Sequence, residues 1–238
     1  MERFANRDVC DISILDYTNQ KPIMYIDYAN ATSTELTGES VYAYGGHGHV
    51  KRVTFTGERA GTLTLETQVQ TFELYQLITG GTLSDTAKVV KREVLTAGSD
   101  GLTLSATPVG GTVNVYAAND DCGAAIEASA SGTKVSGSSI TSGNEYIAYY
   151  IEEKSNVKSV SIGAQSFPKN VTIHGETYMT TEAGETIPYK MIAWKAMPQS
   201  NAQFGFSNTG DPQTLTITFD LMADTKNGDK ILDLIMEN

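Results

Sequence analysis

Histidine is the side chain best suited to bind a metal or move a proton near neutral pH, and the chain has three. His47 and His49 lie two residues apart, so an extended backbone points both imidazoles to the same side. Zinc needs at least one more ligand, and no cysteine or carboxylate lies at a suitable spacing. The surrounding glycines predict a flexible loop tip instead. His174, between Ile173 and Gly175 in a strand pattern, is predicted to be a surface histidine.

Two other groups of residues could carry chemistry. Residues 119–123 read NDDCG, which suggests a calcium loop or a reactive thiol at Cys122. The ligand order of an EF-hand is missing, and Asp or Asn before Gly is common in turns, so we predict a turn. Glu152 and Glu153 are adjacent at the end of a strand pattern. They therefore point to opposite faces and cannot act as a pair.

Sequence motifs of enzymes are absent. There is no GxSxG, P-loop, HExxH or GxGxxG followed by a helix. A glycosidase needs only two carboxylates that meet in space. However, with 8% aromatic residues and the single tryptophan Trp194, the chain offers little surface for stacking on a sugar. We predict that the protein is not an enzyme, with no catalytic residue, cofactor or bound metal.

The formal charge of −11 argues against nucleic-acid binding. Proteins that hold DNA or RNA draw most of their affinity from Lys and Arg side chains that neutralise phosphates. The two basic doublets, Lys51-Arg52 and Lys91-Arg92, are interpreted as solvated faces of strands. A chain this acidic is expected to repel DNA.

The compartment is predicted from the cysteines and the apolar runs. Cys10 and Cys122 are far apart and form no CxxC pattern, which argues against a disulfide scaffold and favours a reducing compartment. The N-terminal segment is polar, and no run approaches about 18 apolar residues. We expect a soluble protein that is made in the cytosol, neither secreted nor inserted into a membrane.

The elements that must position these residues are mostly strands. The composition, with 22 glycines and many Thr and Ser, and the single clear helical pattern predict a mainly β fold with one packed helix. Residues 50–67 predict a hairpin whose loop lies at residues 57–61. Its two strands would pair Phe55 with Leu63.

The helix is predicted over about residues 67–79. Thr67 and Gln70 have the spacing of a capping box, and Gly80 can adopt the positive φ that ends a helix. The predicted apolar stripe consists of Val69, Phe72, Tyr75 and Ile78.

Strands are predicted on both sides of this segment. Residues 11–28 predict two antiparallel strands whose continuous apolar runs suit coverage on both faces, by a core and by a neighbouring subunit. Residues 30–50 predict a long extended loop. Residues 215–221 have the clearest alternation in the chain. Residues 231–235 form an apolar end that we expect to dock on its own sheet or on a neighbour.

Composition divides the chain into three parts. Residues 97–153 are rich in Gly and Ser and predict a small β insert of short strands. Residues 1–96 and 154–238 are predicted to form the two parts of one β-sandwich or barrel, with the helix in the first part.

Several of these features occur together in one known family. The helix followed by two glycines, the β insert and the segments FPKNVTIHGETYM and FGFSNTGDPQTLTITFDLMAD resemble tail tube proteins of tailed bacteriophages. The most informative part is residues 195–201, KAMPQSN, followed by Gly210-Asp211-Pro212 and a Thr-rich strand. The resemblance covers nearly the whole chain and transfers no catalytic residue.

The resemblance implies a structural virion protein in the phage tail, assembled in the cytoplasm of the host bacterium. Copies would form hexameric rings that stack into a tube through which DNA passes without specific binding. Tail sheath, baseplate, tape measure and tail terminator proteins would be its other partners. Six copies at −11 each would carry −66 formal charges, which suits a negatively charged conduit for DNA ejection.

Two alternatives remain. A carbohydrate-binding or adhesion module could use Tyr42, Tyr44 and the Gly-rich loop beside them, and would stay monomeric and bind glycans. A tube protein of a related contractile injection or secretion system would be physically the same object. The sequence does not separate contractile from non-contractile tails.

Overall fold

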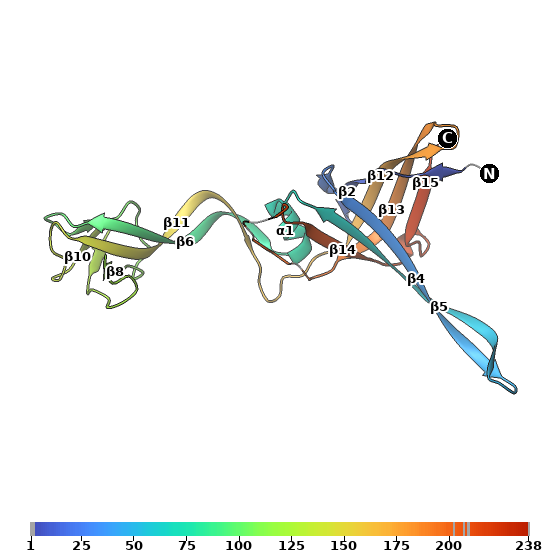
Figure 1. Cartoon of the computed structure of the whole chain (residues 1–238), viewed down its shortest axis with the longest axis horizontal. Helices are drawn as coiled ribbons and strands as arrows, with labels where there is room; N and C mark the ends of the chain where they lie inside the picture. Colours follow the sequence, from blue (N-terminus) through green and yellow to red (C-terminus); the bar gives the residue numbers. More distant parts are fainter. Residues whose placement is uncertain (1–2, 202, 207, 209, 238) are drawn as a thin grey trace. The chain divides into compact units, whose positions relative to one another are not determined.

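The computed structural model describes residues 3–201, 203–206, 208 and 210–237. The chain forms two compact units (Figure 1). Unit 1 consists of Met1–Thr82 and Val160–Asn238, and unit 2 of Leu83–Ser159. Unit 2 is thus wider than the segment 97–153 that composition delimits, because the chain enters it along one long strand and leaves it along another. The mainly β fold with a packed helix is confirmed.

Unit 1 is built on one antiparallel sheet with the strand order β3-β2-β12-β13-β14-β5-β4, to which β1 and β15 add at β12 and β13. Its strands are β1 (Phe4–Ala5), β2 (Asp11–Asp16), β3 (Pro22–Ile26), β4 (Ala31–Gly45), β5 (Val50–Thr67), β12 (Val171–Thr181), β13 (Thr186–Pro198), β14 (Leu215–Leu221) and β15 (Leu232–Met236). The predicted hairpin of residues 11–28 is confirmed as β2 and β3.

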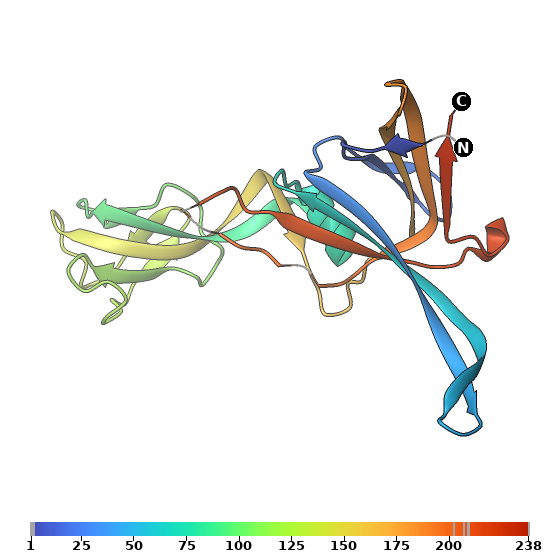
Figure 2. The same ribbon diagram turned by 45° about the vertical axis from the view of Figure 1, so that its right-hand side comes forward.

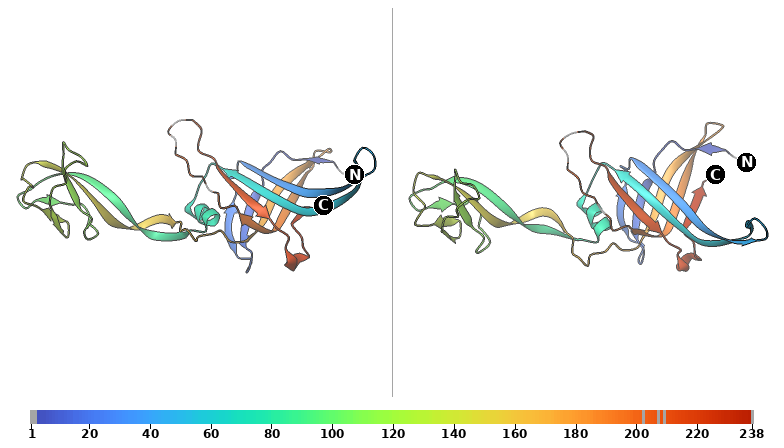
Figure 3. Two further views of the ribbon diagram at one scale, coloured as in Figure 1. Left: turned by 90° about the horizontal axis from the view of Figure 1, so that it is seen from below. Right: turned by 60° about the horizontal axis from the view of Figure 1, so that its bottom comes forward.

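Strand β13 connects the two parts of this sheet. Its residues 189–193 pair with β15, whereas residues 196–198 pair with β14. The part with β2, β12 and β13 and the part with β14, β5 and β4 enclose one core (Figures 2 and 3). The C-terminal strand docks on its own sheet, as predicted, although Leu234 stays 59% exposed.

The core follows the predicted alternation. In β14, Leu215, Ile217, Phe219 and Leu221 are buried. They form one cluster with buried aliphatic side chains of other strands and of the helix. These are Ile12, Ile14, Ile26, Leu63, Leu65, Leu74, Ile78, Val171 and Ile173.

The helix is shorter than predicted, and its cap is a different residue. Helix α1 spans Phe72–Thr79, with Thr71 as N-cap, whose hydroxyl accepts a hydrogen bond from the Leu74 amide at 3.1 Å. Thr67 instead is the last residue of β5. Strand pairing keeps Thr67 extended, so the helix starts at the next residue that can cap it. The predicted end at Gly80 is confirmed, with φ of 67°.

The buried face of α1 also differs from the predicted stripe. Leu74 and Ile78, one turn apart, lie in the core. Val69 precedes the helix and is exposed, as is Phe72. Of the four predicted positions, Ile78 is buried and Tyr75 packs partly against the core.

The predicted hairpin within residues 50–67 is wrong, as is the predicted loop at residues 30–50. Strand β5 continues through both Gly57 and Gly61, and it pairs along its length with β4. Gly61 allows close packing instead of a turn, since a Cβ there would lie 2.8 Å from Leu36 Cδ2. The turn lies at residues 46–49, where Gly46 and Gly48 have φ of 85° and 90°.

Unit 2 has its own core between two three-stranded sheets, β6-β11-β8 and β7-β10-β9. Short strands lie within residues 97–153, as predicted. Leu102, Val115, Val135 and Tyr150 are almost fully buried. The strands are β6 (Thr82–Thr96), β7 (Leu102–Thr103), β8 (Asn114–Ala117), β9 (Ser129–Ser131), β10 (Lys134–Ser136) and β11 (Glu145–Ser161).

Candidate self-assembly surfaces

The β4–β5 hairpin extends past the strand that supports it. β14 pairs with β5 only as far as Gly61, so residues 37–60 form a two-stranded ribbon with no third strand among the described residues (Figure 1). We call residues 37–60 the arm. The first eleven residues of β5 are all exposed. An isolated two-stranded ribbon is marginally stable in water, so the arm is suited to contact a partner.

One face of the arm is apolar. Val41 lies opposite Phe55, and Ala43 lies opposite Val53. Val41, Phe55 and Val53 are 62%, 58% and 49% exposed. Exposed apolar side chains that gather on one face of a soluble protein mark an interaction site.

The other face of the arm carries the tyrosines of the carbohydrate alternative. The ring of Tyr42 is covered by Lys51, whose Nζ lies 3.6 Å from its centre, and Tyr44 meets Tyr42 edge-on. A sugar would have to displace the lysine to stack on Tyr42. This arrangement does not favour the carbohydrate alternative.

His47 and His49 lie in the turn at the tip of the arm, as the prediction of a loop tip required. His49 has φ of 47°. Within the described parts of the chain, no group of three His, Cys, Asp or Glu side chains is placed to hold a metal ion.

At the opposite edge of the sheet, the outer face of β3, β2 and β12 forms a shallow groove. Ile23 and Tyr25 are 49% and 58% exposed. The Tyr25 hydroxyl donates to Asp11 Oδ2 at 3.1 Å, and this bond raises the pKa of Tyr25, with further contributions from burial and from the charges of Asp11, Asp27 and Glu176. The groove is lined by Ser13, Leu15, Pro22, Ile23, Met24, Tyr25, His174 and Glu176.

His174 in this groove is half-buried, which corrects the prediction of a surface histidine. Burial lowers its pKa, and the charge of Glu176 only partly offsets this. Since β12 has neighbours on both sides, the imidazole packs among side chains of the adjacent strands.

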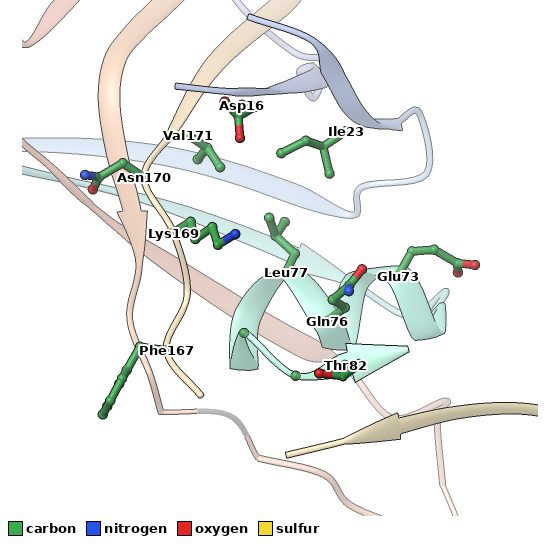
Figure 4. A pocket seen from close by; sticks show the side chains of 12 residues that line it. Asp16, Ile23, Glu73, Gln76, Leu77, Thr82, Phe167, Lys169, Asn170 and Val171 are labelled. Atoms are coloured by element: carbon green, nitrogen blue, oxygen red, sulfur yellow. The ribbon is translucent and has the colours of Figure 1, made fainter. Parts of the chain in front are cut away.

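A second pocket, of about 410 Å³, lies beside α1 (Figure 4). Its apolar part consists of Ile23, Leu77 and Val171, and Lys169 and Asp16 also line it. Asp16 is engaged by the backbone amides of Thr18 and Asn19. The lining includes no histidine or cysteine.

The remaining sequence candidates lie in unit 2. Glu152 is buried and pairs with Lys154 at 3.2 Å and Lys91 at 3.8 Å, whereas Glu153 is exposed, so the two glutamates point apart as predicted. Lys91 is half-buried and contacts the buried carboxylate of Glu152, which corrects its interpretation as part of a solvated face.

Glu93 joins this network as an acceptor. It accepts hydrogen bonds from the amide and the hydroxyl of Ser105 and from the Tyr150 hydroxyl, and it pairs with Lys91. Burial opposes its charge, but these bonds outweigh that effect and lower the pKa of Glu93. The network gives β6 and β11 a shared polar contact.

Arg92 and Cys122 lie near Tyr149. Arg92 pairs with Asp121 at 2.8 Å, and the Cys122 thiol lies 3.6 Å from the Tyr149 hydroxyl. Residues 119–123 form the predicted turn, and both cysteines are free thiols.

Sequence reasoning missed the arm. The signal that could have found it is the frequency of Thr, Val and Tyr within residues 31–45, a composition typical of a strand that pairs with the one beginning at residue 50. The four turn residues between them, GHGH, favour a loop by their composition.

No helix among the described residues is long and apolar enough to cross a membrane. The model of the YomU/Tube protein family matches residues 6–232. Among curated proteins, none matches the chain.

Proposed function

Because the chain belongs to the YomU/Tube protein family, which makes it a phage tube-type structural protein, we propose that its copies form hexameric rings that stack into a tail tube. The observation that carries this proposal is the arm. It presents an apolar face that its own sheet leaves exposed. Identical neighbours that cover this face would complete the fold of each copy.

The ends of the sheet support the same proposal. In the strand order of unit 1, β3 and β4 are the outermost strands, and in the part of the chain that the structure describes each pairs along one edge only. Open edges of long strands invite aggregation unless they are covered. A closed ring covers every edge with the next copy and leaves none to pair at random.

The charge supports a conduit for DNA. Unit 1 contains 19 acidic and 11 basic residues, a formal charge of −8, and unit 2 contains 9 and 6, a charge of −3. We propose that carboxylates of unit 1 face the bore, since an acidic wall lets DNA slide while a basic wall would bind its phosphates. Reversal of several such carboxylates to Lys should slow DNA delivery during infection. Unchanged delivery would contradict the acidic bore.

The proposal also places the protein in the virion tail after assembly in the host cytoplasm. There it would contact tail sheath, baseplate, tape measure or tail terminator proteins. It performs no reaction in this role.

Replacement of residues 38–59 by Asn-Gly tests the role of the arm. The dipeptide forms a two-residue hairpin turn between Thr37 and Ala60, which pair in the ribbon. The shortened chain should fold but sediment as a monomer, while the full chain sediments as rings or polymers. Polymerisation of the shortened chain at the wild-type concentration would contradict the proposal.

A further inference from the structure

We propose that the tip of the arm of one copy docks in the groove on β3, β2 and β12 of another copy, with Lys51 and Arg52 facing Asp11, Asp27 and Glu176. This inference rests on the proposed self-assembly and names the surface that receives the arm. The proposal rests on the opposite charges of the arm and the groove and on the exposed apolar side chains of both surfaces.

The outer part of the arm, residues 40–57, is basic in an acidic protein, whereas Glu39 and Glu58 lie at its base. Residues 40–57 contain Lys51 and Arg52 and no Asp or Glu, although the chain has 28 acidic residues. Among the described residues, neither cation forms an ion pair. Lys51 lies over Tyr42, and Arg52 donates to the carbonyl of Gly45 at 3.3 Å.

Carboxylates adjoin the groove, and their charges are poorly compensated within one copy. Glu176 lines the groove, Asp11 accepts a hydrogen bond from Tyr25 in it, and Asp27 directly follows β3. Asp11 and Asp27 form no ion pair in the described parts of the chain. Glu176 lies 3.9 Å from Lys190, but that lysine is much closer to Glu237, at 2.6 Å. The carboxylates at this end of the groove can therefore receive cations from outside.

The apolar parts also match. On the face of the arm that carries Lys51, Tyr44 is 54% exposed, and the groove presents Ile23 and Tyr25, which are 49% and 58% exposed. An exposed ion pair contributes little binding free energy by itself. We therefore expect the burial of apolar side chains to supply most of the affinity and the charges to fix the orientation of the arm in the groove.

The positions of the two surfaces suit contact between copies. β4 and β3 lie at opposite ends of the strand order, and the arm points away from β2 (Figures 1 and 2). A contact between two different surfaces of identical copies is heterologous, and it generates either a ring or an open stack. A tube requires contacts of this type.

A charge-reversal experiment on the full chain tests the proposal. The arm variant is Lys51→Glu with Arg52→Glu, and the groove variant is Asp27→Lys with Glu176→Lys. Each variant alone should raise the concentration needed for polymerisation at least tenfold, as measured by sedimentation and electron microscopy. The control, Lys88→Glu with Lys134→Glu in unit 2, makes the same charge change as the arm variant and should polymerise like the wild type.

Mixing the two variants identifies the contact. In an equimolar mixture, wild-type arms meet wild-type grooves and reversed arms meet reversed grooves, so polymerisation should return to within about threefold of the wild type. If either variant alone polymerises like the wild type, or if the mixture stays unassembled, the assignment is overturned. If the wild type itself never polymerises, the proposed function falls as well.

Circular dichroism and thermal melting verify that each variant is folded. If a reversal variant is unfolded, the neutral variants Lys51→Gln with Arg52→Gln and Asp27→Asn with Glu176→Gln replace it. The neutral variants should polymerise more weakly than the wild type, and their polymerisation should depend less on the salt concentration. A salt dependence equal to that of the wild type would overturn the proposal.

Discussion

Two phenylalanines separate folding from assembly. Phe219 is fully buried in the core of unit 1, whereas Phe55 is 58% exposed on the arm. Phe219→Ala should lower the free energy of unfolding by about 3–5 kcal/mol, because it leaves a cavity. Phe55→Ala should change it by less than about 0.5 kcal/mol and still weaken polymerisation. Chemical denaturation and sedimentation of both variants measure the two effects, and an equal loss of stability would contradict this division.

The carboxylate of Glu93 makes unit 2 sensitive to acid. Its pKa is lowered in the folded state, so its ionised form contributes stability above the unfolded value of about 4.5, and this contribution is lost as the pH falls through the folded value. The melting temperature of unit 2 should therefore decrease less in Glu93→Gln than in the wild type as the pH is lowered below about 4.5. Thermal melting between pH 3 and 7, a range set by that window, measures this. Parallel pH profiles of wild type and variant would contradict it.

At the scale of the element, the N-cap of α1 can be tested directly. Thr71→Ala removes the oxygen that accepts from the Leu74 amide and should lower the free energy of unfolding by about 1 kcal/mol. Thr71→Ser keeps that oxygen and should be close to the wild type. Chemical denaturation of both variants tests the cap. An equal decrease in the free energy of unfolding of the two variants would assign the decrease to the lost methyl group of Thr71 instead.

The elements also show what the sequence could predict. The sequence predicts strand β14 because the apolar residues Leu215, Ile217 and Phe219 alternate with polar residues, so that one face enters the core, a pattern that burial alone determines. It does not predict the arm, because Gly57 and Gly61 suggest a turn. Their role as sites of close packing depends on β4 and β14, which local spacing does not reveal. The groove was equally hidden, since it unites β3, β2 and β12 from distant parts of the chain.

At the scale of the whole molecule, unit 2 is expected to be separable from unit 1. Each unit has its own buried cluster, and the Ser159 hydroxyl donates to the carbonyl of Ser84, so the ends of the inserted segment lie close together. Replacement of Leu83–Ser159 by a short Gly-Ser linker should leave a folded unit 1 that still polymerises. Circular dichroism and electron microscopy measure both properties. A folded chain that no longer polymerises would assign an assembly role to unit 2.

The central claim is that each copy is completed by identical neighbours. Electron microscopy of the purified full chain over a range of concentrations tests it most directly. The account predicts rings with sixfold symmetry that stack into tubes as the concentration rises. A particle that remains a monomer at every concentration would contradict it.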